Sequence, residues 1–100
     1  MATIERFEEL DVWQTARTLT NRVYKHTREE PFSKDFGLRD QIQRASVSVM
    51  SNIAEGFESR TQNVFIDYLG HARGSAGEVR AQLYVARDQD YLSDDEVEGT

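Results

Sequence analysis

The last third of the chain carries a heptad pattern, and this pattern limits the possible folds more than any other feature. Its apolar positions follow one another at spacings of four and three over three heptads: Phe65, Leu69, Ala72, Ala76, Val79, Leu83 and Ala86. This is the a/d seam of helices that pack lengthwise in bundles. The spacing predicts a helix over residues 61–88, with Thr61 as its N-cap.

The same segment has a second face of small and apolar residues. Its members are Ile66, Gly70, Gly74, Gly77, Ala81 and Tyr84. Each glycine inside a helix costs about 1 kcal/mol relative to alanine, which is a considerable fraction of a small domain's stability. We expect the close approach of another helix backbone to offset this cost. The helix is therefore expected to pack on two sides.

Two further helices are predicted from apolar residues that recur every three or four positions. The first covers residues 8–27, and its apolar stripe contains Leu10, Trp13, Ala16, Val23 and Tyr24. The second covers residues 36–58, and its main face contains Ile42, Ala45, Val49, Ile53 and Gly56. A second apolar set lies about 130° around this helix and contains Val47, Met50, Ala54 and Phe57. We expect the helix over residues 36–58 to be central.

The ends of these helices have recognisable signals. Pro31 cannot continue the first helix, and Ser33 or Asp35 is a candidate N-cap for the second. Ser93 and Glu96 have the spacing of a capping box, which predicts the start of a fourth helix. Few residues follow it. The sequence thus predicts one all-α domain over residues 1–100, a bundle whose last helix is missing or cut short.

Composition excludes several classes of site. The chain has no cysteine, which excludes disulfides, zinc–thiolate sites and thiol catalysis. Asp67 and His71 are four residues apart, but two ligands do not make a metal site, and no Glu-x-x-His pair is present for a di-iron site. We expect no cofactor and no catalytic site. No apolar run could span a membrane and the start is too charged for a signal peptide, so a cytoplasmic protein is expected.

The negative charge of the chain is concentrated at one end. The net charge is −6, and residues 88–100 contain six acidic and no basic groups. The rest of the chain is neutral and could present a basic face. The candidate nucleic-acid contacts are Arg17, Arg22, Lys25 and Arg28. The alternative is that these cations form a solvated helix end and complement the helix dipole.

Polar residues also lie among the apolar ones on the second and third predicted helices. They are Arg44, Ser48, Asn52, Glu55, Arg73, Ser75 and Glu78. An arginine removed from water requires a partner, so pairs between helices or subunits are expected, with Arg44 or Arg73 as partners of Glu55. Three interpretations remain open: a structural network, a contact with a partner or nucleic acid, and a catalytic site.

Several segments in combination resemble a known family. They are "FEELDVWQTARTLTNRVYKHT", "QIQRASVSVMSNIAEGFES" and "FIDYLGHARGSAGEVRAQL". Together they resemble the bacterial proteins named after intervening sequences of 23S ribosomal RNA genes, a family related to accessory proteins of diversity-generating retroelements. The resemblance extends from Phe7 to about Leu92.

The resemblance implies an antiparallel up-and-down four-helix bundle whose subunits form a homopentameric ring. It also implies a non-enzymatic scaffold or adaptor that binds RNA or DNA, or a nucleic-acid enzyme such as a reverse transcriptase. The alternative is a protein-interaction module with no nucleic-acid role, which would bind a basic partner through its acidic end.

Overall fold

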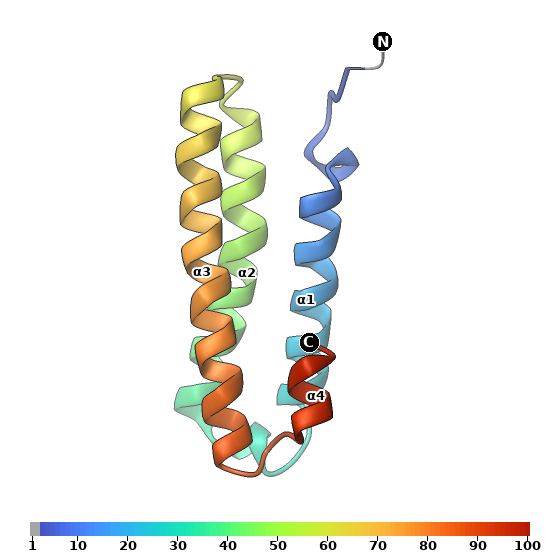
Figure 1. Ribbon diagram of the computed structural model, residues 1–100, viewed down its shortest axis with the longest axis vertical. Helices are drawn as coiled ribbons and strands as arrows, with labels where there is room; N and C mark the ends of the chain where they lie inside the picture. The colour runs from blue at the N-terminus through green and yellow to red at the C-terminus, as the bar shows by residue number, and fades with distance from the viewer. Residues whose placement is uncertain (1–2) are drawn as a thin grey trace.

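The structure is a computed structural model that describes residues 3–100, and this part of the chain contains no β-strand. Four α-helices follow one another: α1 (Asp11–Thr27), α2 (Phe36–Glu58), α3 (Gln62–Asp88) and α4 (Asp94–Glu98). Figure 1 shows α2 and α3 as an antiparallel hairpin, with α2 drawn between α3 and α1. The short α4 lies beside the lower half of α1. The all-α, up-and-down arrangement is as predicted. The molecule is elongated, with extents of 47 × 22 × 18 Å.

Helix α2 is central because its main face meets both neighbours. All five residues of the predicted main face, from Ile42 to Gly56, are buried. Four of them, all but Gly56, contribute to two apolar clusters. The lower cluster contains Val23, Phe32, Ile42, Ala45, Val79, Leu83, Ala86 and Leu92. The upper cluster contains Ala16, Val49, Ile53 and Ala72. The predicted heptad seam of α3 is confirmed, since each of its positions is buried or half-buried.

The close approach of α2 and α3 depends on Gly56. A Cβ atom at Gly56 would lie 2.6 Å from the Cβ atom of Tyr68 and 3.0 Å from Cδ1 of Phe65. The glycines of α3 are different, because a Cβ atom at Gly70, Gly74 or Gly77 would meet nothing within 4 Å among the described residues. Within residues 3–100, no second backbone therefore approaches α3 at these three glycines, contrary to the expectation.

The helix ends confirm two capping predictions and correct one boundary. Asp35 is the N-cap of α2, and its Oδ1 atom accepts from the amide of Leu38 at 3.2 Å. Ser93 and Glu96 form the predicted capping box of α4, with bonds of 3.1 and 2.9 Å. Helix α1 begins at Asp11 and not near residue 8, because Leu10 is extended and a separate 3-10 turn, η1 (Phe7–Glu9), precedes it.

Buried hydroxyl groups join α1 to α2. Thr20 donates to the carbonyl of Ala16 at 2.9 Å and lies 3.1 Å from the carbonyl of Ser46. Thr27 donates to the carbonyl of Val23 and accepts from the Gln43 amide at 2.9 Å. These bonds satisfy polar groups that the packing of α1 on α2 removes from water.

Within residues 3–100, no helix has the length and apolar content needed to cross a bilayer.

Candidate functional site

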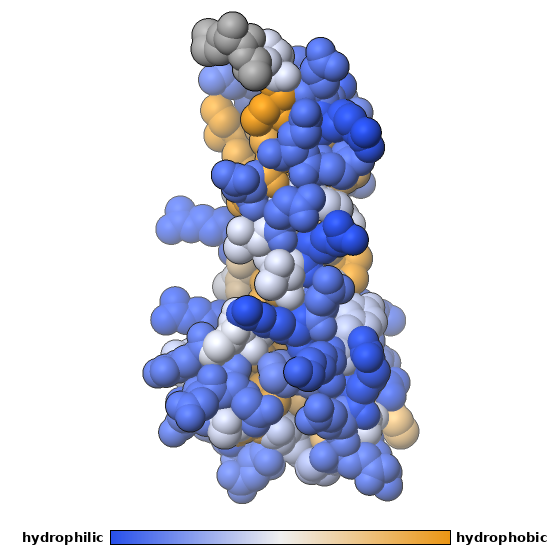
Figure 2. Space-filling model, turned by 90° about the vertical axis from the view of Figure 1, so that its right-hand side faces the viewer, coloured by the Kyte–Doolittle hydropathy of each residue, from blue (hydrophilic) through white to orange (hydrophobic). Residues whose placement is uncertain are grey.

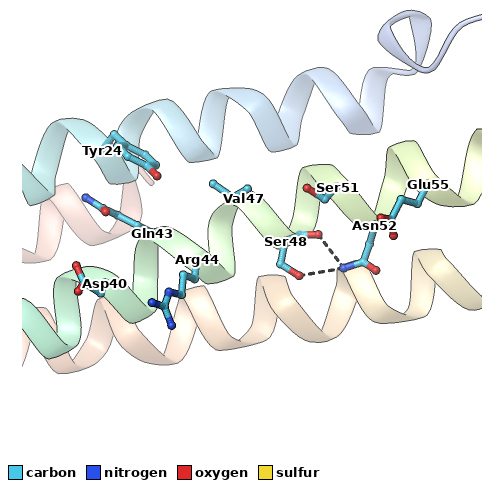
Figure 3. A pocket seen from close by; sticks show the side chains of 9 residues that line it. All are labelled: Tyr24, Asp40, Gln43, Arg44, Val47, Ser48, Ser51, Asn52 and Glu55. Carbon is cyan, nitrogen blue, oxygen red and sulfur yellow. Dashed lines mark hydrogen bonds between the residues drawn. The ribbon is translucent and has the colours of Figure 1, made fainter.

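A polar groove of about 750 Å³ runs along the exposed side of α2. We call it the α2 groove. Its lining consists of Tyr24, Asp40, Gln43, Arg44, Val47, Ser48, Ser51, Asn52 and Glu55. Figure 3 shows that all but Tyr24, which comes from α1, are carried by α2. Tyr24 and Val47 are 36 % and 40 % exposed, so apolar surface lies beside the charged groups. Tyr24 was predicted on the apolar stripe and lies instead at the edge of this groove.

Two serines and an asparagine form the hydrogen-bond network of this region. The Asn52 amide donates to the carbonyl and to the Oγ atom of Ser48, at 2.8 and 3.0 Å (Figure 3). The Oγ atoms of Ser48 and Ser75 are 2.9 Å apart, which links α2 to α3. Asn52 and Ser75 are half-buried. Three members of the predicted polar set, Ser48, Asn52 and Ser75, therefore take part in a network between helices.

The charged members of the predicted set do not pair in the single chain. Arg44, Glu55, Arg73 and Glu78 are all exposed, and the ion pairs found in residues 3–100 include none of them. Pairing of these groups between subunits stays a prediction.

Arg44 separates the α2 groove from a second hollow between α2 and α3. This hollow has a volume of about 370 Å³, and its lining includes Ser75, Glu78 and Gln82. The Oε1 atom of Gln82 is buried and has no donor within the described part of the chain. A buried acceptor without a donor costs free energy. A donor supplied by another molecule would satisfy it.

Helix α3 presents an apolar surface on its outer side. We call this the α3 outer face, and it consists of Ile66, Gly70, Gly74, Gly77, Ala81, Tyr84 and Val85. Ile66, Tyr84 and Val85 are 57 %, 41 % and 45 % exposed. Large apolar side chains on a face whose glycines meet no other described residue indicate an interaction surface.

The four candidate nucleic-acid contacts do not form one patch. Arg17 and Arg22 lie about 140° apart around α1, at roughly 100° per residue. Arg22 donates to the carbonyl of Gly99, next to the acidic α4. Arg17 lies over the ring of Trp13, at 5.9 Å from its centroid. Arg28 is exposed at the end of α1.

At the end of the molecule that carries α4, side-chain contacts join the connecting segments and α4 to α1 and α2. The hydroxyl of Tyr91 donates to Asp35 at 3.0 Å, and this bond raises the pKa of the Tyr91 phenol. The backbone amide of Ser93 donates to Glu96, which lowers the pKa of that carboxyl group. His26 lies 3.8 Å from the other Glu96 oxygen and 3.0 Å from the Thr100 hydroxyl. The Ser93–Glu96 bond belongs to the predicted capping box. The contacts of Tyr91 and His26 were not predicted, since each joins residues far apart in sequence.

The sequence of residues 8–100 matches the model of a protein family described as "23S rRNA-intervening sequence protein". The chain belongs to this family. The match covers all four α-helices, α4 included. A search of curated proteins found no match.

Proposed function

We propose that this 23S rRNA-intervening sequence protein is a non-enzymatic scaffold in which several copies of the chain form a ring. The observation that carries the proposal is the α3 outer face, where exposed Ile66, Tyr84 and Val85 flank three glycines. Each glycine costs about 1 kcal/mol in a helix. Contact with another copy would offset this cost by allowing the close approach that the single chain lacks.

The proposed ring joins the α3 outer face of one copy to the α2 groove of the next. A contact between two different surfaces repeats around a closed ring when the rotation between copies closes. The groove offers Val47 and Tyr24 to an apolar face, and Arg44 lies beside the unsatisfied Gln82 acceptor. The number of copies that we propose is five, following the resemblance described above.

The ring would hold RNA, or a nucleic-acid enzyme such as a reverse transcriptase. One chain offers only a weak positive surface, because the body of the chain is neutral and Arg22 donates to the Gly99 carbonyl beside the acidic α4. Repetition of Arg17, Lys25 and Arg28 around a ring would make individually weak contacts add up through avidity. The binding would then weaken as salt rises, since phosphate contacts release counterions.

Light scattering at several concentrations tests the assembly. We expect a mass about five times the chain mass of 11.5 kDa for the wild type, and about the chain mass for Gly74→Leu. Gly37→Leu is the matched control, since Gly37 lies in α2 with nothing within 4 Å and is outside both proposed surfaces. A wild-type monomer at all concentrations, or equal masses for the two variants, would contradict the ring.

A gel shift with structured RNA at two salt concentrations then tests binding, with Arg17→Glu/Arg28→Glu as the variant expected to abolish it.

A second candidate function is a protein-interaction module with no nucleic-acid role. The observation in its favour is that Asp94, Asp95 and Glu98 are exposed on one short helix. Such a cluster would attract a basic partner. Removal of residues 93–100 would also remove Val97 from the lower core, so a cleaner test is a pull-down with Asp95→Asn/Glu98→Gln. Loss of a basic partner with this variant, combined with no RNA binding by the wild type, would favour this function over the first.

A further inference from the structure

One side of α2 stays exposed along most of the helix. Its residues follow one another at spacings of four, three, four, four and three, and we call them the α2 stripe: Asp40, Arg44, Val47, Ser51, Glu55 and Glu58. Asp40 is half-exposed, and the other five are exposed. The first five line the α2 groove and follow one another along the helix in Figure 3. Such spacing places residues along one side of a helix, where a second helix can pack lengthwise.

The exposed side of α3 has the same spacing when it is read in the opposite direction. All six of its residues are exposed, and from the C-terminal end they are Asp88, Tyr84, Ala81, Gly77, Arg73 and Gly70. We call them the α3 stripe, which follows the α3 outer face and adds charged residues at its margin. Because the spacings match, every residue of the α2 stripe has a counterpart when two such helices are laid antiparallel.

The side of the molecule that carries α1 is different. Helix α1 lies on the right in Figure 1, and Figure 2 shows that this side has a mostly hydrophilic surface. Hydrophobic groups gather there near the end that carries the N-terminus. A lengthwise contact with another copy is therefore better placed on α2 and α3.

The proposed ring brings the two stripes together in the antiparallel direction. Within one chain α2 and α3 are antiparallel (Figure 1). Rotation about an axis along the helices does not change their direction, so the α3 of the next copy is also antiparallel to α2. Alignment of the stripes gives six facing pairs, with the α2 residue first: Asp40–Asp88, Arg44–Tyr84, Val47–Ala81, Ser51–Gly77, Glu55–Arg73 and Glu58–Gly70.

Charge complementarity supports this alignment. Glu55 faces Arg73, and both are exposed and absent from the ion pairs found in residues 3–100. Arg44 faces the ring of Tyr84, which is 41 % exposed and can accept a cation–π contact. Asp88 lies one turn from Tyr84, within reach of the same guanidinium group. The two ends of the contact therefore each join groups that attract one another.

One facing pair carries like charges, at the end of the alignment. Asp40 already accepts from Arg39 at 3.0 Å, and Asp88 accepts from Arg87 at 3.2 Å. Each carboxylate therefore has a cation beside it in its own chain, and the repulsion between the two aspartates is reduced.

Displacement of one stripe by seven residues keeps a lengthwise contact but loses these pairs. In one direction, Glu55 faces the aliphatic side chain of Ile66. In the other direction, Val47 faces Asp88, and Arg44 lies beyond the end of α3. Each displacement places a carboxylate against an aliphatic group, which removes it from water without a partner. The charges therefore favour the first alignment.

We propose that the Glu55 carboxylate of each copy pairs with the Arg73 guanidinium of the next copy, and that this pair sets the register of the α2 stripe on the α3 stripe. The proposal rests on the proposed ring and names the groups by which one copy recognises the next. Arg44 against Tyr84 holds the other end of the same contact. A charge pair within a long contact fixes its register, because other alignments leave these charges unpaired.

Exchange of the two charges tests the pair. Glu55→Arg and Arg73→Glu each place like charges across the contact, and each is expected to raise the concentration needed for assembly at least tenfold by light scattering. The double variant Glu55→Arg/Arg73→Glu restores an opposite pair and is expected to assemble near the wild-type concentration. Glu55→Arg/Arg80→Glu is the matched control, since Arg80 lies seven residues from Arg73, and it is expected to stay as impaired as Glu55→Arg alone. Circular dichroism melts verify that each variant is folded.

Cysteine cross-linking tests the register without a change of charge. The chain has no cysteine, so Ser51→Cys/Gly77→Cys introduces one facing pair on exposed positions. Oxidation is expected to give a ladder of covalent multimers on a denaturing gel, because the two positions of the contact come within disulfide distance. Ser51→Cys/Gly70→Cys, displaced by seven residues, is the matched control and is expected to give no ladder.

The outcomes separate the register from the ring. If the wild type assembles but the double charge exchange does not restore assembly, or the ladder comes from the Gly70 control instead of Gly77, the register is wrong and the ring stands. A wild type that stays monomeric at every concentration overturns both. Rescue by the Arg73 exchange alone, with the ladder at Ser51 and Gly77, establishes the pair.

Discussion

The contact at Gly56 gives a prediction whose size can be worked from the structure. In Gly56→Ala, the new methyl group would lie 2.6 Å from Cβ of Tyr68 and 3.4 Å from Cα of Phe65. Carbon atoms in contact are normally 3.5–4.0 Å apart, so α3 must move away from α2 by about 1 Å. These atoms belong to or adjoin the α3 backbone, and a rotamer change cannot relieve the contact.

Two effects of opposite sign decide the result. Alanine raises helix stability by about 1 kcal/mol relative to glycine, whereas overpacking costs about 1–3 kcal/mol. Because α2 and α3 must separate around Gly56, we expect the cost of overpacking to exceed the gain in helix stability by about 1–2 kcal/mol. For a domain of this size, this corresponds to a fall in the melting temperature of roughly 4–15 °C.

The assay is thermal unfolding followed by circular dichroism, with Gly70→Ala as the matched control. Gly70 lies in α3, and a Cβ atom there meets nothing within 4 Å in the described chain. The same substitution at Gly70 is therefore expected to raise the melting temperature of the unassembled chain. Equal shifts for the two variants, or a more stable Gly56→Ala, would refute the argument that Gly56 permits the close approach.

Two further predictions concern the lower end of the molecule. The Tyr91 pKa is raised above its usual value of 10.0 by the bond to Asp35, so this stabilisation is present below about pH 10 and is lost as pH rises through the raised pKa. Melts between about pH 8 and pH 11 should therefore show a stability difference between wild type and Tyr91→Phe that shrinks at the alkaline end, and a constant difference would contradict the bond. In Ser93→Ala, loss of the capping box should cost about 1 kcal/mol by urea unfolding at neutral pH. The stabilisation that the Glu96 carboxylate contributes to this box is fully present above the unfolded pKa of about 4.3 and is lost as pH falls through the lowered pKa of the folded state. A wild type that keeps its full stability in acid would contradict this contribution.

Local signals predicted α2, α3 and the start of α4. The periodic apolar residues of α2 and α3 and the Ser93–Glu96 pair act over one or two helical turns, so these elements can be predicted from the sequence alone. The predicted start of α1 at residue 8 was wrong for an equally local reason. Two glutamates before Leu10 suit the first turn of an α-helix, but the Glu9 carboxylate accepts from the amides of Glu5 and Arg6 and holds a separate 3-10 turn.

The polar set could be predicted only in part. Ser48, Asn52 and Ser75 belong to the predicted polar set, and they join α2 to α3 through the Ser48 hydroxyl. Arg44 and Glu55 lie at the margin of the buried face, where a rotation of a few tens of degrees decides between burial and exposure. A helical wheel has no information on which neighbour covers that margin, so their exposure in the single chain could not be predicted.

The short connection between α2 and α3 has a consequence for the order in which the molecule folds. Only residues 59–61 separate the two helices, so closing this hairpin costs little chain entropy and its contacts are local. Helix α1 is synthesised first, but its partner surface exists only after α2 has formed, and the Thr20 bond to Ser46 spans 26 residues. We therefore expect the hairpin to form as the nucleus and α1 to join it afterwards. The order of folding then differs from the order of synthesis.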